Sequence, residues 1–244
     1  MYSQDELKQF KNKILNMDCY DFLKELPDKS IDLVLTDPPY QFIDQNLKGG
    51  GFMKKENKSH LEEVKNIFGL NFNPKVLLNQ CKRVLKTFNL YIFTNKNLLA
   101  DYLNFAIENN FSYDILIWQK PNPIPCFNNH YLSDKEYCIF IREKGAYFNS
   151  NLKYEKYFTI FDYPVGKKET KHPNEKPINL IKKILEISTK ENDLILDCFS
   201  GSGTTAIACQ DMKRRFICIE KDKNYFEKSN KRLEDFKKQL VFEF

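Results

Sequence analysis

The sequence lacks a long apolar run, although 42% of its 244 residues are hydrophobic. No stretch approaches the ~20 apolar residues that a membrane-spanning helix needs, so we expect no membrane association. The opening stretch MYSQDELKQF carries acids and no apolar segment, and it therefore does not read as a signal peptide. A chain of this length can bury one sizeable core. We expect a single domain over residues 1–244 that works in the cytoplasm.

The chain also lacks paired metal ligands. Its seven cysteines are scattered without a C-x-x-C pair, and its three histidines stand alone. This usage predicts reduced thiols and no metal site. The net charge of +5 is mild, but it permits a polyanionic partner such as a nucleic acid.

Glycine is scarce, with eight residues, and two of them flank Ser202 in the stretch LILDCFSGSGTTAIAC, residues 194–209. A predicted strand ends at Asp197, and the glycine turn then opens a helix, which matches the G-x-G-x-x-G/A fingerprint. Glu220 ends the next predicted strand, where a carboxylate suits hydrogen bonds to ribose hydroxyls. An ordinary strand-to-helix turn is the alternative, but turn, helix, strand and acid together predict a cofactor that contains a nucleoside.

Strands alternate with helices along most of the chain, which predicts an α/β fold with a doubly wound, mostly parallel sheet. After a short apolar run at 14–15, strands are expected at 31–35, 90–93, 113–118, 137–142, 194–197 and 215–219. Helices are expected at 20–26, 74–85, 98–109, 178–188 and 204–211, with a charged helix at the carboxyl end.

The stretch VLTDPPY, residues 34–40, ends a predicted strand abruptly. Pro38 and Pro39 cannot continue a ladder because each lacks an N–H. Ligands of open α/β sheets bind beyond the carboxyl ends of the strands, so this loop and the glycine loop are expected to share one crevice. The Asp37 carboxylate, the Pro38 carbonyl and the Tyr40 ring could there grip a flat polar ligand; a surface turn is the alternative.

In this order the motifs resemble the β class of amino-group DNA methyltransferases, the permuted class in which the catalytic motif precedes the S-adenosylmethionine motif. The likeness rests on DPPY at 37–40, DCFSGSGT at 197–204 and HPNEKP at 172–177. WQKPNP at 118–123 is similar to a further block of the family, so the resemblance covers nearly the whole chain. Met17 stands where the family usually has glycine.

The resemblance implies a Rossmann-like, S-adenosylmethionine-dependent methyltransferase fold with a small inserted recognition region. It implies site-specific methyl transfer to the exocyclic N6 of a flipped-out adenine in DNA. The implied catalytic residues are Asp37, Pro38, Pro39 and Tyr40. The implied cofactor-binding residues are Asp18, Cys19, His172, Asn174, Lys176, Asp197, Phe199, Ser200, Gly201, Ser202, Gly203, Thr204 and Glu220.

Three alternatives remain open at this point. The first is transfer to N4 of cytosine, although family members of that kind more often carry Ser where Asp37 stands. The second is a catalytically idle nucleic-acid-binding module, but such a copy would be expected to have lost Asp37, Tyr40 or Gly201. The third is an NAD dehydrogenase, which would need a His or Tyr acid that the sequence does not offer.

Two segments are candidates for contact with DNA. Residues 41–60 contain three consecutive glycines and several lysines, which predicts a flexible loop after the catalytic motif. Residues 121–171 interleave basic and aromatic side chains, as a target-recognition region does. Double-stranded DNA is the expected partner. By the resemblance, a cognate restriction endonuclease is a further candidate partner, and a homodimer is expected.

Overall fold

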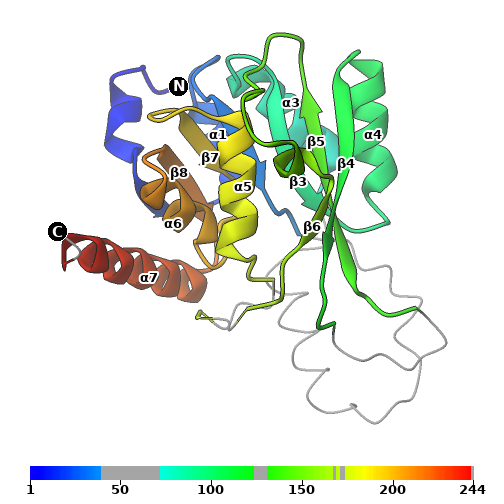
Figure 1. Ribbon diagram of the computed structural model, residues 1–244. Coiled ribbons are helices and arrows are strands. Elements are labelled where there is room, and N and C mark those ends of the chain that lie inside the picture. Colours follow the sequence, from blue (N-terminus) through cyan, green and yellow to red (C-terminus); the bar gives the residue numbers. More distant parts are fainter. Residues whose placement is uncertain (40–71, 124–130, 167–168, 171–173, 243–244) are drawn as a thin grey trace, which may run out of the picture.

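The computed structural model describes residues 1–39, 72–123, 131–166, 169–170 and 174–242. Its centre is an eight-stranded sheet with the order β1-β8-β7-β2-β3-β5-β4-β6 (Figure 1). The strands span, in that order, Lys13–Asn16, Arg215–Glu220, Leu194–Asp197, Leu33–Thr36, Asn89–Thr94, Lys135–Arg142, Ser112–Gln119 and Ile160–Asp162. The predicted α/β fold with a mostly parallel sheet is confirmed.

Helices cover both faces of the sheet and make a three-layer molecule (Figure 1). One core packs α1 (Cys19–Glu25), α3 (Pro74–Val84) and α4 (Leu99–Glu108) on one face. The other packs α5 (Ile178–Ser188), α6 (Thr204–Asp211) and α7 (Lys223–Phe242) on the opposite face. Strand residues serve the two cores in turn: in β3, Leu90 and Ile92 face the first core, while Tyr91 and Phe93 face the second. This period of two explains the uninterrupted apolar strands, since each buries both faces.

Strand β5 is the one reversed strand among the eight that the structure describes. It pairs antiparallel with β3 and with β4, whereas the other neighbouring strands pair in parallel. Its amino end therefore lies at the sheet edge where the other strands have their carboxyl ends, with Tyr137 opposite Thr94 and Lys135 opposite Gln119. Short elements that the sequence did not predict are β6 and the 3-10 helices Glu6–Phe10 and Tyr154–Tyr157.

Local sequence signals set where two of the helices begin. Asn73 caps α3 because its side-chain oxygen accepts from the backbone N–H groups of Lys75 and Val76, and Pro74 occupies the first turn. Asp18 caps α1 by accepting from the N–H of Tyr20. No helix in the described part of the chain is both long enough and apolar enough to cross a membrane. The six cysteines of the described residues are buried free thiols.

Candidate active site

The site lies at the topological switch point of the sheet, at the carboxyl ends of β2 and β7. These strands are neighbours, and the chain leaves β2 towards β3 and leaves β7 towards β8. The hydroxyl of Thr36 joins the two ends, since it donates to Asp197 Oδ1 at 3.1 Å and accepts from the N–H of Cys198 at 3.2 Å. A cavity of about 360 Å³ opens beside this junction. Its size and place are typical of ligand sites in α/β sheets.

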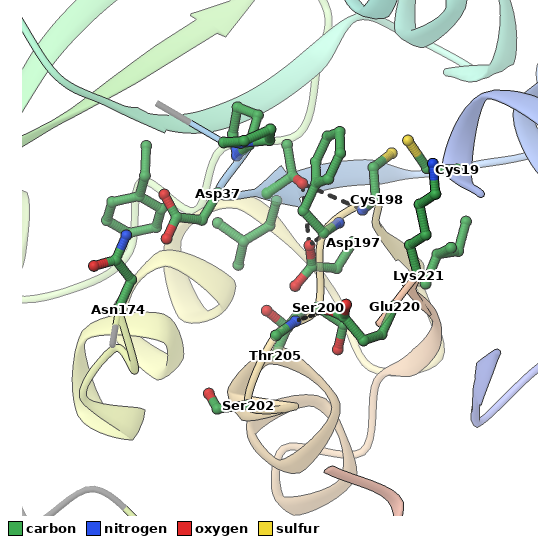
Figure 2. Close-up of a pocket in the computed structure, with 18 of the residues that line it drawn as sticks. Cys19, Asp37, Asn174, Asp197, Cys198, Ser200, Ser202, Thr205, Glu220 and Lys221 are labelled. Atoms are coloured by element: carbon green, nitrogen blue, oxygen red, sulfur yellow. Dashed lines mark hydrogen bonds between the residues drawn. The ribbon is translucent and has the colours of Figure 1, made fainter. Parts of the chain in front are cut away.

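The two predicted loops line this one cavity, as the sequence led us to expect. Asp37, Pro38 and Pro39 come from the end of β2, and Gly201 and Ser202 come from the turn before α6. Figure 2 shows Asp37 and Asn174 at one end of the cavity and Glu220 and Lys221 at the other, with Asp197 between them.

The turn before α6 uses its two glycines in different ways. Both have positive φ, 50° at Gly201 and 77° at Gly203, a conformation that favours glycine. Gly201 lines the cavity, and its N–H donates to Glu220 Oε2 at 2.7 Å. Gly203 faces away from the cavity: a Cβ atom there would lie 3.0 Å from the Cβ of Ser229 in α7 and 3.2 Å from Ile14 Cδ1. Gly203 thus permits α6 to pack closely on α7 and β1.

Two buried carboxyl groups on this side have raised pKa values. Glu220 accepts backbone N–H bonds from Gly201 and from Asp222, but burial outweighs them and raises its pKa to about 7. Burial likewise raises the pKa of Asp197 to about 6, although the N–H of Phe199 and the hydroxyl of Thr36 donate to it. Both acids titrate near neutral pH, which is common in functional sites.

The far end of the cavity is formed by the start of α1. Asp18, the cap of that helix, pairs with Lys221 Nζ at 3.0 Å. Burial opposes ionisation of Asp18, but the bonds from Lys221 and the N–H of Tyr20 together lower its pKa below the ordinary value. Phe72 and Phe199 add apolar surface, with their rings in an edge-to-face pair whose centroids are 6.0 Å apart. A flat heterocycle with polar edges would suit such walls.

The Asp37 end carries a buried chain of alternating charges. Lys176 Nζ lies 2.5 Å from Asp37 Oδ2 and 3.0 Å from Glu136 Oε2. Lys120 Nζ contacts the other carboxylate oxygen of Glu136 at 2.6 Å. Burial alone would raise the pKa of Glu136, but the two ammonium groups lower it to about 2.

Most of the predicted site residues come together here. The cavity is lined by Asp18, Cys19, Asp37, Pro38, Pro39, Asn174, Lys176, Asp197, Phe199, Ser200, Gly201, Ser202, Thr204 and Glu220. Gly203 does not line it, for the packing reason given above. Tyr40 and His172 lie outside the described residues, as do residues 41–60 and parts of the segment 121–171. Trp118, the first residue of the WQKPNP block, is buried in the core, and its ring N–H donates to the carbonyl of Tyr163 at 2.7 Å.

Several lining or supporting residues were missed by sequence reasoning. Glu136 reaches the site because β5 is reversed, and no local pattern predicts the direction of a strand. Lys120 directly follows the carboxyl end of β4 and joins the site through its contact with Glu136. Phe72 lies far from any of the motifs in sequence. Lys221, by contrast, directly follows Glu220, so its place at the end of β8 was a usable signal. Among the described residues, no group of three or more His, Cys, Asp or Glu side chains is arranged to hold a metal ion.

Comparisons with known proteins agree with this geometry. The family model described as DNA methylase, for N6 and N4 methyltransferases, matches residues 31–231. The type II methyltransferase M2.MboI of Moraxella bovis is 33% identical over 262 residues, which cover 100% of this chain and 94% of that protein. The type II methyltransferase M.HinfI of Haemophilus influenzae is 28% identical over 261 residues, which cover 96% of this chain and 71% of that protein.

A solved structure agrees as well. The crystal structure of an M1.HpyAVI–SAM complex matches with a TM-score of 0.66 and 27% identity, over 91% of this chain and 99% of that chain. The family model alone spans well over half of the sequence, and it includes the loop at Asp37, the strand of Glu136 and the glycine turn. The chain therefore belongs to the DNA methylase family of N6 and N4 methyltransferases.

Proposed function

We propose that this DNA methylase moves a methyl group from S-adenosylmethionine to the exocyclic N6 amine of an adenine within a specific DNA sequence. One observation carries the proposal: the Asp37-Pro38-Pro39 loop and the Gly201 turn line the same cavity. A donor held by the glycine turn and an acceptor held by the loop can therefore meet within one enclosed space.

The chemistry of the cavity fits S-adenosylmethionine. The carboxylate of Glu220 can accept from the ribose hydroxyls, because each of its oxygens accepts one backbone N–H and has a second acceptor position. The rings of Phe72 and Phe199 suit the adenine, and the acids Asp18 and Asp197 suit a ligand with cationic groups. When bound, the cofactor supplies a methyl group activated by a sulfonium.

The Asp37 loop can make the exocyclic amine of the target adenine, which is a weak nucleophile, more reactive. The lone pair of an exocyclic amine on a nucleobase is delocalised into the ring. Asp37 and the Pro38 carbonyl would each accept one N–H bond from the amine, which draws the lone pair back to nitrogen and aims it at the methyl group. Positioning and fixed electrostatics of this kind supply most of the rate in such transfers. The methylated nitrogen is strongly acidic, so Asp37 need not remove a proton in the slow step.

The target base must leave the duplex, because its amine cannot reach an enclosed cavity while it is stacked and paired. From the sequence we assign the stacking surface to Tyr40. Stacking on an aromatic ring contributes about 1–3 kcal/mol and offsets part of the cost of extrusion. The presence of Asp37, in place of Ser, favours adenine over cytosine.

The proposed activity and the relatives also indicate which partners the protein binds. Double-stranded DNA is the substrate, and residues 41–60 and 121–171 are proposed to contact it. Two of the relatives are named type II methyltransferases, which supports a cognate restriction endonuclease as a companion. We also propose a homodimer, because dimers are common in the family that the sequence resembles.

The test is transfer of a tritiated methyl group from S-adenosylmethionine to a mixed-sequence duplex, followed by mass spectrometry of the nucleosides. We expect radioactivity in DNA and N6-methyladenine among the products. N4-methylcytosine in its place would assign the chain to the alternative specificity. No transfer to duplex or single-stranded DNA would overturn the proposed function.

A further inference from the structure

Lys176 is enclosed by groups that leave its ammonium little freedom. Its side chain is 6% exposed and lies between the carboxylates of Asp37 and Glu136, at 2.5 and 3.0 Å. The rings of Phe93 and Trp118 also face the ammonium, with their centroids 4.9 and 5.9 Å from Nζ. Lys176 is thus held by two anions and two aromatic rings, and one of the anions is the proposed catalytic carboxylate.

The two partners of Lys176 come from opposite directions in the sheet. Asp37 follows the carboxyl end of β2, while Glu136 is the second residue of the reversed strand β5. The backbone of Glu136 is registered opposite Trp118 of β4, so it belongs to the rigid sheet rather than to a loop. A sheet residue is a firm anchor for a side chain that must hold a catalytic group in place.

The charges in this group remain in place despite burial. Burial alone would lower the pKa of Lys176, but the carboxylates of Asp37 and Glu136 raise it above its ordinary value. Lys120 supplies a second cation to Glu136 through the other carboxylate oxygen. The buried ions are therefore paired along a chain, which is the condition under which charges persist away from water.

We infer that Lys176 and Glu136 are positioning residues for methyl transfer: Lys176 holds the Asp37 carboxylate ionised and in one orientation, and Glu136 holds Lys176. This inference rests on the proposed function. It gives Lys176 a role towards Asp37, in addition to the cofactor contact that the resemblance implied.

The arrangement suits the charge that develops during transfer. The attacking nitrogen becomes positive as it takes up the methyl group, and an unbalanced ammonium beside Asp37 would oppose that change. Glu136 balances the charge of Lys176, and Lys120 beyond it leaves the four groups neutral together, with the Asp37 carboxylate as the negative end of the chain. A carboxylate has about four acceptor positions, so a bond from Lys176 is compatible with a bond from the amine.

The protonation of Asp37 depends on its neighbours from several elements. Lys176 favours the ionised form, whereas the buried acid Asp197 of β7 disfavours it. Within the described part of the chain, Tyr102 of α4 and Cys138 and Glu136 of β5 also interact with Asp37 or with Lys176. Loss of Lys176 would thus leave Asp37 among acids, and its proton affinity would rise.

The experiment measures single-turnover methyl transfer against pH for the full chain with duplex DNA and saturating S-adenosylmethionine. For Lys176→Gln, we expect the acidic limb of the profile to move to higher pH. For Glu136→Gln, we expect the plateau rate to fall about 10²-fold, the order that a small misplacement costs, without an upward move of the limb. The affinity for the cofactor should stay near that of the unaltered chain in Glu136→Gln. Glu186→Gln, which breaks the solvent-exposed pair with Lys156, is the matched control.

If Lys176 and Glu136 only stabilise the fold, their variants should have lower melting temperatures. The folded protein should then transfer methyl groups at the unaltered rate, and the acidic limb of its pH profile should not move. That result in both variants overturns the inference. If Lys176→Gln does not fold, Glu136→Gln decides alone, and an unchanged plateau in it overturns the inference. Absence of any transfer by the unaltered chain would instead overturn the proposed function.

Discussion

The backbone N–H of Gly201 donates to Oε2 of Glu220 at 2.7 Å, which ties the turn before α6 to the end of β8. The second oxygen of the same carboxylate accepts from the N–H of Asp222 at 2.8 Å. Glu220 therefore organises both loops at the proposed ribose end of the cavity. Because burial raises its pKa to about 7, this group changes its charge within the physiological range.

Cofactor affinity should consequently depend on pH. The carboxylate form of Glu220 is the better acceptor for ribose hydroxyls, so the affinity for S-adenosylmethionine should fall as the pH drops below about 7. Glu220→Gln should lower the affinity roughly tenfold or more, since a hydrogen bond to a charged group contributes about 1.5–3 kcal/mol. Calorimetric titration from pH 5.5 to 8.5 measures both effects. Glu220→Gln lacks the titrating carboxylate, so any change of affinity with pH that remains in it comes from other groups, including those of S-adenosylmethionine. If the affinity of the unaltered chain changes with pH in the same way as that of Glu220→Gln, the assignment of Glu220 to the ribose is contradicted.

Asp37→Asn should slow methyl transfer strongly and preserve cofactor binding. Its amide keeps the shape of the side chain, but it loses one acceptor oxygen and the negative charge beside the target amine. We expect a loss of about 10²–10³-fold in the single-turnover rate, the usual effect of removing one preorganised stabilising group. Asp101→Asn, on the exposed surface of α4, is the control. A rate close to that of the control would show that Asp37 does not act on the amine.

Gly203→Ala should destabilise the protein through two separable effects. A side chain at φ 77° is strained, and its Cβ would lie 3.0 Å from the Cβ of Ser229. Gly145 has φ 95° with nothing within 4 Å of an added Cβ, so Gly145→Ala reports the backbone strain alone. We expect a loss of about 1–3 kcal/mol from overpacking in Gly203→Ala beyond the loss in Gly145→Ala. Equal urea midpoints for the two variants would contradict the packing role of Gly203.

Arg232→Met should weaken the site from a distance. Arg232, in α7, donates to the carbonyl of Ser202 and to Thr204 Oγ1, each at 3.1 Å, and its Nη2 lies 3.3 Å from Glu175 Oε1. Glu175 in turn accepts from the N–H and the hydroxyl of Thr170. Removing the arginine leaves a buried carboxylate without its cation.

We expect the Arg232→Met change to cost about 3–5 kcal/mol of unfolding free energy. We also expect weaker cofactor binding, because Arg232 supports the glycine turn. Lys231→Met, at the exposed neighbouring position, should alter neither quantity. Thermal melts and calorimetry on the same samples check the prediction, which fails if the two variants behave alike.

The shared cavity of the Asp37 loop and the Gly201 turn could be predicted from the sequence. Each loop has a local sequence motif, and a general rule of α/β sheets brings the two loops together. Asp37 and Gly201 each follow an apolar strand, and strands of an open α/β sheet bring their carboxyl ends to one edge. The central helices and strands were likewise predicted to within a few residues, since their apolar patterns and caps lie within each segment. Their order in the sheet depends on the chain's crossovers, and the alternation of elements indicated only that the sheet is mostly parallel.

The contact of Glu136 with Lys176, strand β6 and the packing of Gly203 could not be predicted from the sequence. They depend on the direction of a strand, on a very short segment and on contacts between residues far apart in the chain. Glu136 reaches Lys176 only because β5 runs against its neighbours, and an isolated apolar run such as Tyr137–Arg142 does not encode its direction. Strand β6 has three residues, too few for an alternating pattern to be recognised. The fit of Gly203 against Ser229 joins the glycine turn to a helix that the sequence marked only as charged and amphipathic.

The central claim is that Asp37 grips the amine of an extruded adenine opposite the methyl donor. The most direct measurement is a crystal structure of the chain with duplex DNA and sinefungin, a non-reactive analogue of S-adenosylmethionine. The account predicts an adenine turned out of the helix, with its N6 within about 2.6–3.2 Å of the Asp37 carboxylate and facing the analogue across the cavity. An adenine that remains stacked in the duplex, or an N6 held by other groups while Asp37 stays remote, would contradict it.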